Sequence, residues 1–93
     1  MEKGIIFKYP VNFSGSTIIK VPEHSQLLSI QAQGNDVVAY FLENQLQKDT
    51  DGVKQYNLYS VGTGHGFTIE RNMEYLNTVM LYDGRFVLHV FKV

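Results

Sequence analysis

Apolar and polar residues alternate along much of this chain, and no segment repeats apolar residues at helical spacing over three turns. The alternation is strictest in LSIQAQ, residues 28–33, where Leu28, Ile30 and Ala32 share one face and polar residues share the other. A period of two is typical of a β-strand that has one buried face. The pattern therefore predicts an all-β fold.

Seven segments carry this alternation or are rich in β-branched and aromatic residues. They are residues 4–9, 17–21, 28–33, 37–42, 53–61, 77–82 and 85–93. Turn sequences separate two pairs of them, Gly34-Asn35-Asp36 between the third and fourth and Asp83-Gly84 between the sixth and seventh. Each pair is expected to form a hairpin, the second with a two-residue type I′ turn whose central residues both need positive φ. The spacing predicts one domain, residues 1–93, folded as a small antiparallel β-sandwich or barrel.

Two connecting segments allow more than one interpretation. Residues 43–52, ENQLQKDTDG, are polar and end in Asp-Gly, so we expect an exposed loop rather than a helical turn. Residues 67–76 place Ile69, Met73 and Leu76 at near-helical spacing, which is compatible with one short helix or with an irregular crossover.

The C-terminal segment RFVLHVFKV is apolar on both faces, which is typical of a central strand or of a strand covered by a second subunit. A homo-oligomer is therefore expected.

Composition excludes several classes of protein. A chain of 93 residues with 44% hydrophobic and 18% charged residues has the apolar content of one globular core. The net charge is −1 and the Lys and Arg residues are scattered, which argues against general nucleic-acid binding. The absence of cysteine excludes disulfides and thiolate metal sites and fits a cytoplasmic location. No apolar run has the length of a signal peptide core or a membrane span, so no membrane association is expected.

The segment SVGTGHGF, residues 60–67, is the one cluster whose composition suggests ligand chemistry. Successive glycines can direct backbone N–H groups at a phosphate or carboxylate, and His and Arg side chains can add donors. Strand alternation also places one nearby tyrosine outside the main core, where it can stack on a ligand or anchor an interface. The candidate binding residues are Tyr59, Gly62, Thr63, Gly64, His65 and Arg71. The alternative interpretation is that the glycines only end a strand, since their spacing matches neither a dinucleotide fingerprint nor a P-loop.

No catalytic residue, metal site or cofactor is expected. Ser60 or Thr63 can be named with His65 and Asp83 as a hydrolytic triad, but sequence proximity does not give the geometry that a nucleophile and its base require. His65 and His89 can approach each other, yet a metal site needs a further ligand. His89 is expected instead at the edge of the core, hydrogen-bonded to backbone.

The chain also resembles a known family through motifs in a fixed order. These are FKYP at residues 7–10, VP at 21–22, LSIQAQ at 28–33, VGTGH at 61–65 and HVF at 89–91. They resemble a family of small bacteriophage and prophage proteins classed as a domain of unknown function, and the resemblance implies a phage origin and a β-rich fold. We therefore expect a non-enzymatic accessory protein that binds a host protein or a small anionic ligand such as a nucleotide. Such binding includes a role in counteracting host defences. The alternative is a structural or assembly component that forms homo-oligomers without a ligand.

Overall fold

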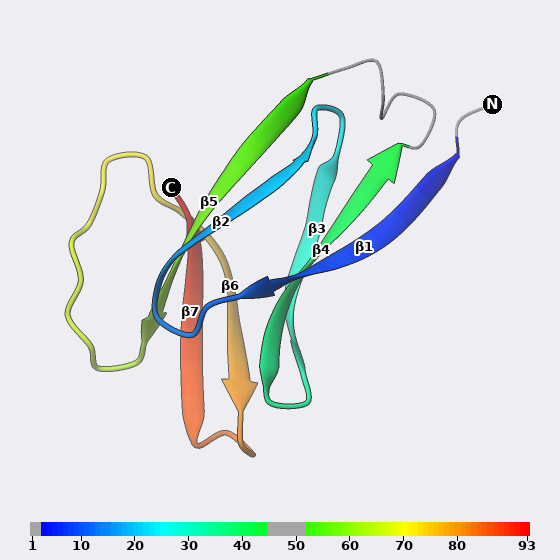
Figure 1. Cartoon of the computed structure of the whole chain (residues 1–93). Helices are drawn as coiled ribbons and strands as arrows, with labels where there is room; N and C mark the ends of the chain where they lie inside the picture. The colour runs from blue at the N-terminus through cyan, green and yellow to red at the C-terminus, as the bar shows by residue number, and fades with distance from the viewer. Residues whose placement is uncertain (1–2, 45–51) are drawn as a thin grey trace.

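The computed structural model describes residues 3–44 and 52–93, and these residues form seven β-strands and no helix (Figure 1). The strands are β1 (Gly4–Val11), β2 (Gly15–Pro22), β3 (Gln26–Gln33), β4 (Asp36–Asn44), β5 (Val53–Gly62), β6 (Glu74–Leu81) and β7 (Phe86–Lys92). The all-β prediction is confirmed. The loop predicted at residues 43–52 falls mostly on residues 45–51, which lie outside the described part, while its first two residues belong to β4.

The short helix considered for residues 67–76 is not formed, so that interpretation is wrong. Residues 63–73 are an irregular crossover between β5 and β6, and β6 begins at Glu74. A helix on this spacing would need its three apolar side chains to share a buried face. Ile69 is instead 82% exposed.

The strands form two antiparallel sheets with the orders β1-β4-β3 and β2-β5-β7-β6. The sheets pack face to face and do not close, so the sandwich prediction is confirmed and the barrel alternative is wrong. β7 lies between β5 and β6, which confirms the central position predicted from its two apolar faces. On one side the two sheets are joined directly, because Asn77 Nδ2 on β6 donates a hydrogen bond to the Ile30 carbonyl on β3 at 2.5 Å.

The two predicted hairpins are both present, but the first has a two-residue turn and the second a four-residue loop. Gln33 pairs with Asp36, so Gly34 and Asn35 form a two-residue turn in which Gly34 has φ 60°. Glycine adopts this left-handed conformation without steric cost. Asn35 Oδ1 also accepts a hydrogen bond from the Tyr82 N–H at 3.1 Å, which ties this turn to the next hairpin.

The turn of the β6-β7 hairpin is longer than predicted. Leu81 pairs with Phe86, which leaves a four-residue loop in place of the expected two-residue turn. Tyr82, Asp83 and Gly84 have φ of 52°, 57° and 84°, and the Gly84 N–H donates to the Leu81 carbonyl at 3.1 Å. The left-handed conformation that Asp83-Gly84 predicted therefore starts one residue earlier, at Tyr82.

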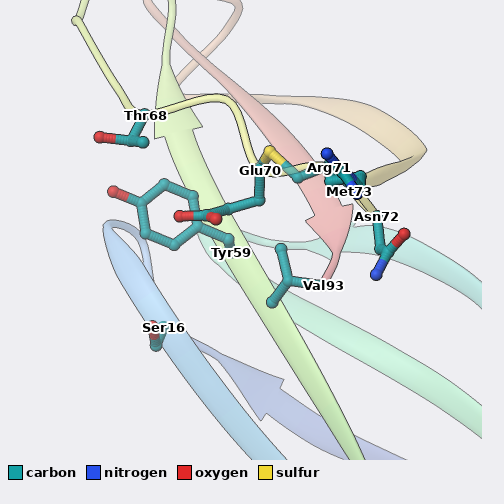
Figure 2. Close-up of a pocket in the computed structure, with 8 residues that line it drawn as sticks. All are labelled: Ser16, Tyr59, Thr68, Glu70, Arg71, Asn72, Met73 and Val93. Atoms are coloured by element: carbon teal, nitrogen blue, oxygen red, sulfur yellow. The ribbon is translucent and has the colours of Figure 1, made fainter.

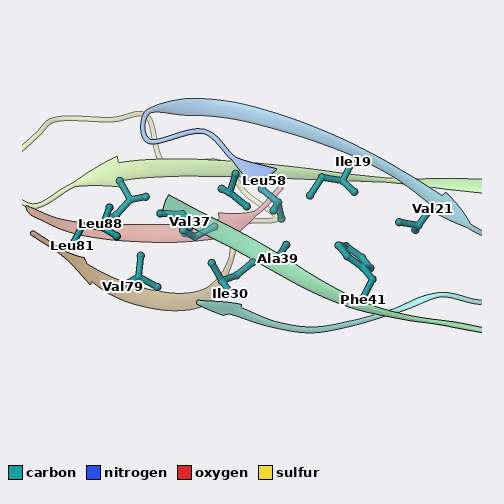
Figure 3. Close-up of a cluster of buried hydrophobic side chains, with 12 residues drawn as sticks. Ile19, Val21, Ile30, Val37, Ala39, Phe41, Leu58, Val79, Leu81 and Leu88 are labelled. Carbon is teal, nitrogen blue, oxygen red and sulfur yellow. The ribbon is translucent and has the colours of Figure 1, made fainter. Parts of the chain in front are cut away.

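The core lies between the two sheets and is made of alternate residues from both (Figure 3). Its largest fully buried apolar side chains are Val21, Ile30, Val37, Phe41, Leu58, Leu81, Leu88 and Val90. The Phe41 ring lies edge-on to Tyr9 and to Tyr56, at centroid distances of 5.4 and 5.0 Å. Removing these side chains from water provides most of the stability of the fold.

The inner face of β4 ends in a buried acid. The Glu43 side chain is 3% exposed, and its carboxylate accepts a hydrogen bond from the Tyr9 hydroxyl. Burial, followed by this hydrogen bond and the negative charge of Glu43, raises the pKa of Tyr9 to about 12. A buried carboxylate needs such a donor, because an unpaired charge is costly to remove from water.

Candidate functional site

The crossover, residues 63–73, covers part of the outer face of the four-stranded sheet. Tyr59, Phe91 and Tyr75 are cross-strand neighbours on β5, β7 and β6, and they alternate with residues that face the core. Phe67 of the crossover packs against Phe91 with ring centroids 5.7 Å apart. The crossover is the yellow segment that extends to one side of β5 in Figure 1.

Between the crossover and the sheet lies an open hollow of about 590 Å³ (Figure 2). Its lining comes from β2, β5, the crossover and the C-terminal residue, and comprises Ser16, Tyr59, Thr68, Glu70, Arg71, Asn72, Met73 and Val93. Figure 2 shows Glu70 between Tyr59 and Arg71. A bound anion would therefore meet the negative charge of Glu70 as well as the positive charge of Arg71.

The structure brings together two of the six candidate binding residues. Tyr59 and Arg71, from β5 and the crossover, both line the hollow, whereas the segment from Gly62 to His65 does not. In that segment the His65 N–H donates to the Gly62 carbonyl at 3.2 Å, and the Thr63 N–H donates to the Val87 carbonyl at 3.2 Å. Two N–H groups that an anion would need are thus already bonded, which favours the interpretation of the segment as a strand ending.

A chain of side-chain hydrogen bonds on the outer face was not predicted from the sequence. His89 Nε2 lies 2.7 Å from Thr63 Oγ1, and His89 Nδ1 lies 3.0 Å from Thr78 Oγ1. The chain continues from Thr78 Oγ1 to the Tyr75 hydroxyl at 2.6 Å. The expectation that His89 bonds to backbone at the core edge is therefore wrong. This row joins the start of the crossover to β7 and β6, so it depends on strand order and register, which alternation alone does not reveal.

This row places a hydroxyl within reach of a base, but it lacks a charged orienting group. In a hydrolytic triad a carboxylate holds the histidine and stabilises its protonated form. Here Thr78, a neutral hydroxyl, occupies that position. Ser60, the other nucleophile named from the sequence, is 1% exposed and faces the core.

Among residues 3–44 and 52–93, no three His, Cys, Asp or Glu side chains gather closely enough to hold a metal ion. The same residues include no helix able to span a membrane.

Comparison with known proteins yields one match. A family model described as a domain of unknown function, DUF7352, matches residues 2–93, which is nearly the whole chain. No curated protein and no solved structure matches the chain.

Proposed function

We propose that the chain, which belongs to the DUF7352 family, is a non-enzymatic accessory protein of phage origin that binds a host protein through the outer face of its four-stranded sheet. The observation that carries this proposal is the hollow that Tyr59 and Arg71 line from separate segments. Tyrosine and arginine are the residue types that most often dominate the binding energy of protein interfaces. The ordered motifs FKYP to HVF support the phage origin, and the lack of cysteine supports action in the host cytoplasm.

A protein fits this surface better than a small anion does. The crossover and β6 also carry exposed apolar side chains, among them Phe67, Ile69 and Tyr75. Contiguous apolar surface carried partly by a connecting segment is typical of interaction sites. A nucleotide or another small anion, the ligand that the sequence also suggested, would need Arg71 without the opposing charge of Glu70.

The non-enzymatic role is supported by the surroundings of His89. Its two ring nitrogens contact the hydroxyls of Thr63 and Thr78. Neither hydroxyl offers the negative charge that would stabilise a protonated histidine during catalysis.

Site-specific photo-crosslinking tests this proposal. A photoreactive residue at Thr68, on the hollow, is expected to capture one host protein in bacterial cells, while the same residue at Gln31, exposed on β3 of the other sheet, is not. The Kd of the captured protein should then rise at least tenfold for Tyr59→Ala and Arg71→Ala, and stay unchanged for Gln31→Ala, because interface energy concentrates in a few central residues.

Two outcomes contradict the proposal. Capture of the same proteins from both positions would show non-specific contact. A rise in melting temperature with phosphate or nucleotides that Arg71→Ala abolishes would instead identify a small anionic ligand.

A second candidate function is assembly into homo-oligomers, and the edge of the three-stranded sheet favours it. β1 is an edge strand, and its Ile6 side chain is 59% exposed. Its second half carries Lys8 and Pro10, which protect an edge against pairing, but residues 4–7 carry neither a charge nor a proline. If this edge pairs between copies, Ile6→Lys should lower the mass measured by light scattering, whereas Ile18→Lys, at an exposed isoleucine on the outer face of β2, should not.

A further inference from the structure

β5 extends beyond the end of its neighbour β7. Pairing between the two strands reaches Leu58 and Lys92, followed by one more hydrogen bond from the Val93 N–H to the Asn57 carbonyl at 2.9 Å. On the other side β2 accompanies β5 as far as Val53. Figure 1 shows this part of β5 with β2 along one side and no other strand along the opposite side. Among the residues that the structure describes, 3–44 and 52–93, no strand pairs with the second side of residues 53–56.

The alternation of an antiparallel ladder identifies which backbone groups face the vacant side. Two hydrogen bonds that flank the paired part of β5 show which residues bond toward β7. They use the Asn57 carbonyl and the Thr63 N–H, and both residues are odd-numbered. In an antiparallel strand every second residue bonds to the same neighbour. The N–H and carbonyl groups of Val53 and Gln55 therefore point to the vacant side. They offer two donors and two acceptors to an added strand.

Two lysines mark the same edge as positively charged. The Nζ atoms of Lys54 and Lys92 each lie 5.4 Å from the centre of the Tyr56 ring, so they are at most twice that distance apart. Glu74 is the cross-strand partner of Lys92 and opposes its charge, whereas Lys54 lies opposite Val21, which carries no charge.

A hollow with a mixed lining lies beside Lys92 and has a volume of about 260 Å³. Tyr56, Leu27 and Leu76 are among its apolar residues, and Glu74 and Lys92 line it as well. The hollow lies between β3 and the ends of β6 and β7, where an inward side chain of a strand added to β5 can enter.

We propose that residues 53–56 of β5 bind an acidic peptide in extended conformation, which adds as a strand antiparallel to β5 and continues the line of β7. The backbone of the peptide pairs with Val53 and Gln55, its carboxylates contact Lys54 and Lys92, and one apolar side chain enters the hollow. Strand addition of this kind takes affinity from main-chain hydrogen bonds and specificity from alternate side chains. A second copy of the same edge is a poor occupant, because it would bring lysine against lysine. This surface differs from the outer-face hollow, and the proposal does not depend on that one.

The test uses the intact chain and two terminally blocked heptapeptides. One has glutamate at positions 2 and 6, leucine at position 4 and threonine elsewhere, and the other has lysine in place of glutamate. In ¹H–¹⁵N NMR spectra the glutamate peptide is expected to shift the amide signals of Val53 and Gln55 and to slow their hydrogen exchange. The double variant Lys54→Glu, Lys92→Glu should bind the glutamate peptide at least tenfold more weakly and should bind the lysine peptide instead. Lys20→Glu, on the outer face of β2, is the matched control and should bind as the unmodified chain does.

A modified peptide keeps the test decisive if the double variant fails to fold. N-methylation of the peptide amides along one edge removes their hydrogen bonds, so this peptide should lose at least tenfold in affinity for the unmodified chain. Equal binding of the methylated peptide would overturn strand addition. The proposal would also be overturned if inorganic phosphate alone displaced the glutamate peptide, or if the peptide shifted Tyr59 and Arg71 in place of Val53 and Gln55.

Discussion

The two faces of the four-stranded sheet consist of alternate residues of the same strands, but different forces hold them. On the inner face Leu58, Leu88 and Val90 are fully buried against the other sheet. On the outer face Thr78 and His89 are only half-buried and are linked by hydrogen bonds. The comparison suggests that the inner face provides the stability of the fold, which leaves the outer face free to serve binding. Substitutions made on one face at a time test this division, because their effects on stability can be compared.

The largest expected effect is on the inner face. Leu88→Ala removes a side chain that is 0% exposed and leaves a cavity, so it should lower the free energy of unfolding by about 2–5 kcal/mol. Urea denaturation measures this change. Val87→Ala, at the neighbouring half-buried position, is the control and should cost about 1 kcal/mol or less. Similar losses at the two positions would contradict the division between the faces.

The next largest effect is expected at the polar end of the inner face. Tyr9→Phe leaves the buried Glu43 carboxylate without its donor and should cost about 1–3 kcal/mol at neutral pH. The pKa of Tyr9 is about 12 in the folded chain against 10.0 ordinarily, so the unfolded chain releases this proton first as the pH rises. The stabilisation is complete below pH 10 and is lost between pH 10 and about 12.

Denaturation at a series of pH values measures this dependence. In the Tyr9→Phe variant the fall in stability between pH 10 and about 12 that we assign to Tyr9 should be absent. In the control Tyr40→Phe, in the neighbouring strand β4, this fall should remain. An unchanged alkaline profile in Tyr9→Phe would show that Tyr9 does not titrate with folding.

A smaller effect is expected where the two sheets meet at one side. Asn77→Ala removes the donor to the Ile30 carbonyl and should cost about 1–2 kcal/mol, since a lost hydrogen bond leaves a part-buried acceptor unpaired. Asn72→Ala, on the exposed crossover, should change stability by less than about 0.5 kcal/mol. Thermal unfolding of the two variants makes the comparison, and equal melting temperatures would show that the contact contributes little.

The smallest effect is expected on the outer face. Thr78→Val keeps the shape of the side chain but removes the hydroxyl that contacts His89 and Tyr75, and it should cost about 0.5–1.5 kcal/mol. The ¹⁵N shifts of the His89 ring should change at the same time, because Nδ1 loses its partner. A loss as large as that of Leu88→Ala would place the outer face among the main sources of stability.

Alternation predicted where the strands lie, because apolar residues recur on the buried face. It failed on the face of LSIQAQ, where Ile30 is buried but Leu28 and Ala32 are exposed. The pairing of β3 shifts between Leu27 and Ser29, so Leu27 packs against the core in place of Leu28.

Alternation placed Tyr59 outside the core, as the structure does, since its neighbour Leu58 is fully buried. It did not reveal pairing partners, because many registers satisfy one hydrophobic pattern. Arg71 joins Tyr59 only because the crossover covers the outer face, and Thr63 meets His89 only because β7 lies between β5 and β6.

The strand order also has a consequence for how the chain folds. β1 and β2 pair with strands far along the sequence, so that Gly4 meets Asn44 and Gly15 meets Ser60. Local hairpins close in about 1–10 μs, whereas domains dominated by distant pairings fold in about milliseconds to seconds. We expect the β3-β4 and β6-β7 hairpins to form early and β1 and β2 to join them late. The two strands that leave the ribosome first are then the last to find their partners, and β2 has none until β5 has been synthesised.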